Sequence, residues 1–262
     1  MLCRAVLVIV VVAGRVAAAA PDDLIARPLV LDQGQARVDL TAEINFSSNL
    51  VGQPTSLAPD LWFGVLPELT VGLIHSDNSL DRIQPGASFC VRTDPIVCPD
   101  GYHGSGLDVL YSITAGSFAA AAHVRVLLFE KPLPDDEPSR FVPAVTIGSA
   151  LRWHRGRWSI DGDPYLQLGV ANRPYGNRAQ LWLPIVLAVQ PIPRLAVEVH
   201  TGWNSALAIV GDGYNVPAGV GVRARALWNV DVGALFGFAS SLGPQNDVKN
   251  RVLFFDLSWH SH

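Results

Sequence analysis

The chain has 262 residues, of which 49% are hydrophobic and 16% are charged, with a formal net charge of −4. Soluble domains usually carry about 25% charged residues, so this chain is poor in charge. The large apolar share excludes an intrinsically disordered protein, and the slightly acidic balance excludes a basic nucleic-acid-binding protein.

The first segment, residues 1–19, is predicted to be a signal peptide that is removed on export. Arg4 supplies a positive start, residues 5–14 form an apolar core, and Ala17-Ala18-Ala19 fits a small-x-small cleavage site. The core is much shorter than the roughly 20 apolar residues that a membrane-spanning helix needs. We therefore expect an exported protein in which residues 20–36 form a short periplasmic lead-in.

The first predicted strand is 37–46, where polar and apolar residues alternate at every position. Successive side chains of a strand point to opposite faces, so this period is a strong strand signal. Related alternation predicts further strands at 58–66, 69–76, 107–114, 118–128, 141–151, 158–169, 179–189, 195–203, 216–225, 229–239 and 250–259. The segment 118–128 is also compatible with a helix. Prolines, which cannot donate to a strand ladder, interrupt four of the predicted strands at Pro143, Pro164, Pro184 and Pro217.

Short and long connections alternate between these strands. The short ones are 67–68, 115–117, 152–157, 190–194 and 227–228, and the long ones are 47–57, 77–106, 129–140, 170–178, 204–215 and 240–249. Short turns at one end, long loops at the other and an even strand number are typical of outer-membrane barrels. No later segment has 18 consecutive apolar residues. Since lipid requires every backbone polar group to be paired, we predict an all-β fold over 37–262: a closed, antiparallel, up-and-down transmembrane β-barrel of about twelve strands.

A soluble secreted β-sandwich or lipocalin-like barrel would also alternate, but with its apolar side chains inward and its polar ones outward. The chain has only two lysines, Lys131 and Lys249, which is few for the water-exposed surface of a soluble protein. Aromatic residues near strand ends also favour a membrane protein, where they gather at both interfaces. We expect Phe118, Trp153, Trp158, Trp228 and Trp259 at the short-turn end, and Phe46, Tyr111, Phe141, Trp203, Phe236 and Phe238 at the long-loop end.

The last predicted strand lies in RVLFFDLSWHSH, where Leu253, Phe255, Leu257 and Trp259 occupy every second position. This pattern resembles the C-terminal assembly signal of bacterial outer-membrane β-barrel proteins, which usually stops at the aromatic residue; here three more residues follow. The resemblance implies a location in the cell outer membrane, with membrane lipids and the barrel-assembly machinery as partners. It implies no single activity, because that family includes porins, transporters, adhesins, lipases and proteases.

In such a barrel the polar side chains that alternate with apolar ones face an enclosed lumen. The residues predicted to line it are Arg37, Asp39, Glu43, His123, Arg125, Arg152, Asp161, Asp163, Glu198, His200, Arg223, Arg225, Asp231 and Asp256. They are interpreted either as a charged constriction that selects small solutes, or as paired charges that fill the barrel. Twelve strands lie between the filled eight-stranded barrels and the open sixteen-stranded porins, so both interpretations stand.

Two cysteines remain after the signal peptide, Cys90 and Cys98, and in an exported protein this pair is predicted to form a disulfide. Their spacing does not match that of zinc sites, and neither a metal nor a cofactor is expected. The disulfide would constrain the loop 77–106, which suggests a surface-interaction barrel as an alternative function.

An enzyme is a third hypothesis. His103 with Ser105 near the outer rim supplies residue types that lipid-modifying enzymes use, but the chain has no G-x-S-x-G or H-E-x-x-H motif. The function expected from the sequence is therefore a narrow passive channel for small solutes or a structural barrel, without nucleic-acid partners.

Overall fold

The computed structural model describes residues 23–47, 51–76, 86–92, 101–131, 140–175, 177–244 and 246–261. The predicted signal peptide lies outside these residues. Within them, no helix has the length and apolar character needed to cross a membrane.

The described elements are short 3-10 helices and β-strands. The helices are η1 (Arg173–Tyr175) and η2 (Leu207–Ile209). The strands are β1 (Ala36–Asn45), β2 (Thr55–Leu66), β3 (Leu69–Ile74), β4 (Phe89–Arg92), β5 (Gly104–Thr114), β6 (Phe118–Lys131), β7 (Arg140–Phe141), β8 (Ala144–Arg155), β9 (Trp158–Gly162), β10 (Tyr165–Gly169), β11 (Gln180–Ile192), β12 (Leu195–Ala206), β13 (Tyr214–Leu227), β14 (Val230–Leu242) and β15 (Asp247–His260).

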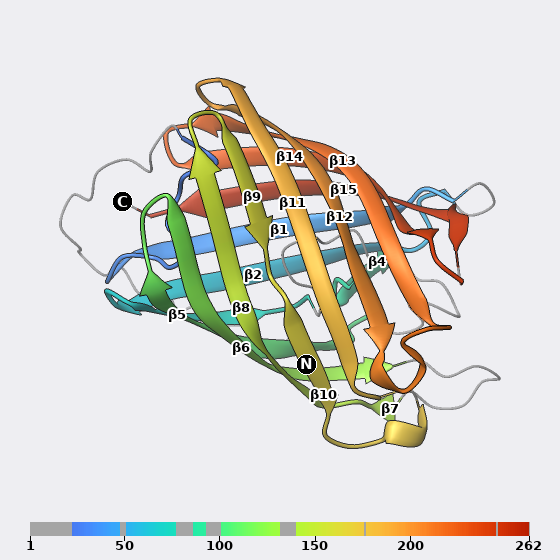
Figure 1. Ribbon diagram of the computed structural model, residues 1–262. Coiled ribbons are helices and arrows are strands. Elements are labelled where there is room, and N and C mark those ends of the chain that lie inside the picture. Colours follow the sequence, from blue (N-terminus) through green and yellow to red (C-terminus); the bar gives the residue numbers. More distant parts are fainter. Residues whose placement is uncertain are drawn as a thin grey trace, which may run out of the picture.

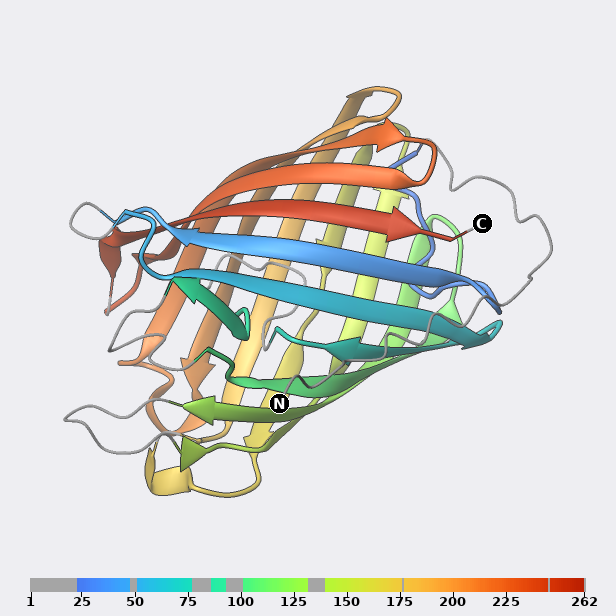
Figure 2. The same ribbon diagram turned by 180° about the vertical axis from the view of Figure 1, so that it is seen from behind.

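Twelve antiparallel spans close into one barrel (Figure 1, Figure 2). The closing pair joins β1 to β15, with Val38 opposite Trp259, while β1 pairs with β2 on its other side. β7 and β8 together form one span, and β9 and β10 form another. The short β4 pairs with β2 beyond the end of β3. This confirms the predicted fold class, and β6 runs through 118–128, so the helical interpretation of that segment is wrong.

The outer face of the barrel is apolar and the inner face is polar. On β1, Leu40 is 39% exposed whereas the neighbouring Asp39 is 8% exposed. On β12, Val197 is exposed and Glu198 is buried, and on β15 the exposed Phe255 precedes the half-buried Asp256. A soluble sandwich or lipocalin-like barrel would show the reverse orientation, so that interpretation is wrong.

Prolines divide two of the predicted strands. Pro143 separates β7 from β8, and Pro164 separates β9 from β10. Pro184 remains inside β11 but faces this second break, where the Asp163 N–H reaches the Pro184 carbonyl oxygen at 3.3 Å. Because proline has no N–H to donate, it fits best where the neighbouring strand is already interrupted.

The two ends of the barrel differ in their connections. Five short connections, 67–68, 115–117, 156–157, 193–194 and 228–229, lie at one end, here called the short-turn end. Exposed aromatic side chains that include Trp153, Trp158 and Trp228 lie close to these turns. Tyr111 was expected at the long-loop end, but it pairs with Leu69, directly after the turn 67–68. Its predicted position was wrong because β5 runs toward the short-turn end and Tyr111 lies near its last residues.

Residues 23–35, the described part of the predicted lead-in, pack inside the short-turn end of the barrel. The segment is dark blue in Figure 1 and Figure 2 and lies at the end that also carries the C-terminus. Leu24 and Ile25 are buried against Ala188 of β11 and Ala196 of β12. The start of the described lead-in is therefore packed against the barrel wall at this end.

Candidate functional site: the barrel lumen

The predicted lumen residues lie on the inner, less exposed face of their strands. Those that are buried are Asp39, Glu43, His123, Arg125, Asp161, Asp163, Glu198, His200, Arg225 and Asp231. Those that are half-buried are Arg37, Arg152, Arg223 and Asp256. The structure divides them into separate groups with different degrees of packing.

A buried histidine lies between two carboxylates on the wall formed by β5, β6 and the β9–β10 span. His123 Nε2 is 2.6 Å from Asp108 Oδ1, and His123 Nδ1 is 2.8 Å from Asp163 Oδ1. Trp62 Nε1 of β2 donates to the other oxygen of Asp108 at 2.8 Å. An imidazole that donates to two carboxylates at once carries hydrogen on both nitrogens, so this group is an ionic cluster of two anions around one cation.

The same wall holds a fully buried arginine. Arg125 Nε donates to Thr146 Oγ1 at 3.2 Å, and the Arg125 Cζ atom lies 4.7 Å from the centre of the Tyr165 ring. A guanidinium over an aromatic face is stabilised by the ring quadrupole. The Tyr165 ring in turn stacks on Trp182, with centroids 5.8 Å apart.

Apolar side chains also pack on this wall. Trp62, Ile74, Leu127, Phe129 and Ala144 form one buried cluster. Around this cluster, the side of the lumen from β2 to β8 is packed like a protein core.

The opposite wall, formed by β12 to β15 and β1, combines a buried apolar cluster of Leu235, Val252 and Phe254 with arginine side chains that are partly exposed. Arg223 Nη2 lies 3.1 Å from Glu198 Oε1, yet 41% of the Arg223 side chain is exposed. Its neighbour Val222 is exposed on the outer face, so the partly exposed Arg223 side chain is directed to the inside of the barrel. Asp256 of β15 and Asp39 of β1 also interact electrostatically with Arg223, although they come from strands beyond its own neighbours.

A second arginine on this side is also partly exposed. Arg37 Nη2 is 2.6 Å from Asp39 Oδ2, and 38% of the Arg37 side chain is exposed. The Arg37 Cζ atom lies 4.4 Å from the centre of the Trp62 ring. Arg37 therefore borders both the packed wall and the solvated wall.

At the short-turn end, the buried carboxylate of Asp231 contacts two arginines and a histidine. Arg225 Nε is 2.6 Å from Asp231 Oδ1, and His260 Nε2 is 3.1 Å from Asp231 Oδ2. The guanidinium of Arg27, in the lead-in, binds Asp231 as well. Burial lowers the pKa of Arg27 from its ordinary value, and the hydrogen bond and charge of Asp231 act in the opposite direction. Arg27 was not among the predicted lumen residues, because polar and apolar residues do not alternate in its segment.

Near the long-loop end, two buried carboxylates hold loop backbone. Glu43 Oε2 accepts hydrogen bonds from the N–H groups of Gly86 and Ala87 at 2.9 and 3.0 Å. Asp60 accepts from the His75 N–H at 2.6 Å and from Ser76 Oγ at 2.8 Å. Asp60 was not among the predicted lumen residues, although it lies two positions before the inward-facing Trp62 on the same strand.

The loop 77–106 is only partly described. Cys98 lies outside the described residues, so the disulfide with Cys90 and the surface-interaction function stay predictions. His103 Nε2 is 3.1 Å from Cys90 Sγ, and the enzyme hypothesis for His103 and Ser105 also stays untested. The residues that the structure describes contain no cluster of three His, Cys, Asp or Glu side chains suited to a metal ion.

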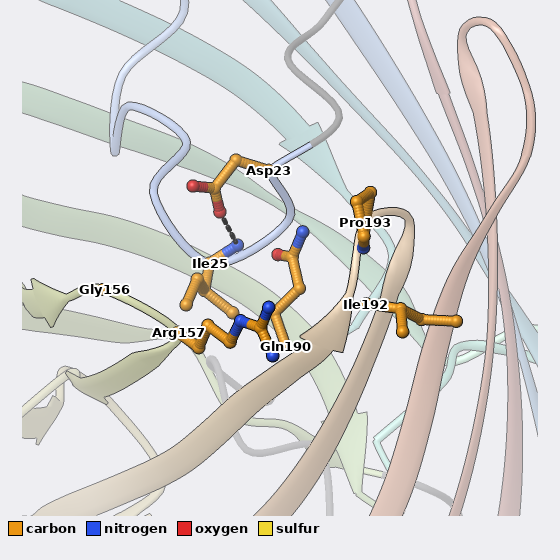
Figure 3. Close-up of a pocket in the computed structure, with 7 residues that line it drawn as sticks. All are labelled: Asp23, Ile25, Gly156, Arg157, Gln190, Ile192 and Pro193. Atoms are coloured by element: carbon orange, nitrogen blue, oxygen red, sulfur yellow. Dashed lines mark hydrogen bonds between the residues drawn. The ribbon is translucent and has the colours of Figure 1, made fainter.

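Two small pockets border the lead-in at the short-turn end. One, of about 150 Å³, lies between Asp23 and Ile25 on one side and Arg157, Gln190 and Pro193 on the other (Figure 3). The second, of about 170 Å³, lies between the stretch 26–30 and the connection of β5 to β6. The lead-in is thus anchored at some points and loosely packed at others.

No family model matches the sequence, and no curated protein matches it. Solved structures with a similar fold include the KdgM porin in complex with disordered oligogalacturonate, at 8% identity and a TM-score of 0.52, covering 86% of this chain and 99% of that one. The NanC porin matches at 6% identity and a TM-score of 0.54, covering 85% and 98%. The COG4313 outer membrane channel from Pseudomonas putida F1 matches at 12% identity and a TM-score of 0.52, covering 88% and 97%.

At these identities the likeness shows the fold. The chain has the outer-membrane β-barrel fold that its C-terminal strand implied, and a closed barrel with an apolar outer face is suited to the outer membrane.

Proposed function

We propose that the protein is a narrow passive channel for small polar solutes in the outer membrane. The observation that carries the proposal is the inward-facing Arg223, whose side chain keeps 41% of its surface exposed while it pairs with Glu198. In a barrel filled by its own side chains this charge would be buried, as Arg125 is on the opposite wall. The path for solutes therefore follows the wall formed by β12 to β15 and β1.

The charges along this path have both signs and lie close together. Arg37 and Arg223 are within reach of Asp39, Asp256 and Glu198. Fixed charges near a constriction select ions and solutes by charge, and mixed signs give only a modest preference. The packed wall on the other side restricts the path, so size is the stronger filter. The porins and the channel that share the fold also support a channel.

Electrical recording from planar bilayers tests this proposal. The purified, folded protein is expected to give small stepwise currents, and Arg223→Ala is expected to shift the reversal potential toward cation preference. Arg178→Ala removes the same charge from an exposed loop position and serves as the control. Folded protein that gives no stepwise current, either intact or with residues 23–33 deleted, would instead support a filled, structural barrel.

A further inference from the structure

The lead-in crosses the whole width of the barrel. It contacts β11 and β12 near Leu24 and reaches β2 at Gly64. In the closed ring of twelve spans, β2 and β11 lie six spans apart, on opposite sides of the lumen. A segment that runs from one to the other must pass across the mouth.

The first anchor holds the segment to β11 and β12. The Leu24 N–H donates to Gln190 Oε1 at 2.8 Å in a buried hydrogen bond. The Leu24 and Ile25 side chains are each 3% exposed and pack against Ala188 and Ala196.

The second anchor is Arg27, which joins three other spans. Its guanidinium binds Asp231 of β14, and its Nη1 lies 3.2 Å from His260 Nε2 of β15. Its carbonyl oxygen accepts a hydrogen bond from Arg152 Nη1 of β8 at 2.5 Å. One residue in the middle of the mouth is therefore tied to both sides of the wall.

The third anchor holds the segment to β2 and β3. The Leu31 N–H donates to Thr70 Oγ1 at 2.7 Å, and Leu31 packs against the cluster around Trp62. Beside it, the Asp32 carbonyl oxygen lies so close to Gly64 that a Cβ atom on Gly64 would be 2.0 Å away. Glycine at 64 is thus needed for the lead-in backbone to dock there.

We propose that residues 23–35 are a plug that closes the periplasmic mouth of the barrel, with Arg27 as its principal attachment. Short turns mark the periplasmic side of outer-membrane barrels, and the lead-in crosses that end. The three anchors described above hold residues 24–31 through side-chain contacts rather than strand pairing, so this part can leave without breaking a ladder of the wall. The pockets of about 150 and 170 Å³ beside it also show that it is not packed continuously.

The inference rests on the proposed channel, and the test separates the two. Full-length protein, Arg27→Ala and a deletion of residues 23–33 are compared in planar bilayers, with Arg155→Ala as a control that removes an exposed arginine from the same end. Removing one partner of a buried ion pair strongly destabilises the docked state, so Arg27→Ala is expected to raise the open fraction on the order of tenfold or more. The deletion is expected to give the largest steady conductance.

Hydrogen exchange of the folded protein gives a readout independent of current. The Leu24 and Leu31 amides are expected to be protected in the parent and in Arg155→Ala, and to exchange faster in Arg27→Ala. If Arg27→Ala does not fold, Gln190→Ala removes the acceptor of the Leu24 N–H and tests the same docking more mildly.

The outcomes differ for the two proposals. Equal currents from the parent, Arg27→Ala and the deletion would overturn the plug and leave the channel. Unprotected lead-in amides in the parent would also overturn the plug. Absence of current from every variant, the deletion included, would overturn the channel and with it the closure of a channel by the plug.

Discussion

Asp108 Oδ1 on β5 lies 2.6 Å from Nε2 of His123 on β6, in a contact that both side chains make while buried. Asp108 is directly opposite Arg125 in the strand register, so its bond to His123 runs diagonally across the two strands. Because His123 also binds Asp163, one imidazole joins two carboxylates from different parts of the wall.

Replacing His123 should be costly for stability. His123→Ala would leave Asp108 and Asp163 buried without their shared cation, and the loss of one partner from a buried pair costs about 3–5 kcal/mol. The measurement is the free energy of unfolding in urea. His154→Ala, at the short-turn end, is the comparison and should stay within about 0.5 kcal/mol of the parent. Similar small effects for both variants would show that the cluster does not hold the wall together.

Gly72 permits the contact between Trp62 and Asp108. A Cβ atom at Gly72 would lie 2.4 Å from Cδ1 of Trp62, so Gly72→Ala must displace the indole. Overpacking of this kind costs typically about 1–3 kcal/mol, measurable as a lower unfolding midpoint. Gly101→Ala is the matched control because no atom lies within 4 Å of its added Cβ. An unchanged midpoint in Gly72→Ala would mean that the indole has room to move.

The outward orientation of β12 predicts the effect of a charge on the lipid face. Val199 lies near the middle of this strand and is 46% exposed, so Val199→Arg should destabilise the barrel in lipid vesicles by about 2–4 kcal/mol. Val210→Arg, at an exposed loop position, should change the free energy of unfolding by less than about 0.5 kcal/mol. A Val199→Arg barrel as stable as the parent would argue against contact of this face with lipid.

The sequence predicts the spans of this barrel well because each strand has a lipid side and a lumen side. Leu40 and Asp39 differ in polarity for that reason, and the alternation of their neighbours identifies the strand. The predicted ends of the strands were less accurate. β8 ends at Arg155 rather than at residue 151, and β11 ends at Ile192 rather than at residue 189. The last residues of these strands lie near the membrane interface, where polar and apolar residues no longer alternate regularly.

Contacts inside the lumen were not predictable in the same way. Alternation places His123 and Asp163 on the inner face, but their contact depends on the register of several strands and on the break before Pro164. The packing of the lead-in inside the barrel was not predicted for a different reason. A segment without alternating polar and apolar residues does not show which of its side chains are buried. The apolar pair Leu24-Ile25 close to Arg27 was the available signal that this segment is buried.

The most direct test of a solvated lumen within an apolar outer wall is the reactivity of cysteines at two adjacent positions of β13. Arg223→Cys and Val222→Cys are each treated, in sealed vesicles, with a small charged thiol reagent that does not enter lipid, with the parent protein as the blank. We expect rapid labelling at 223 and almost none at 222, together with partial block of the current in Arg223→Cys. Labelling at 222 with a protected 223 would contradict the account.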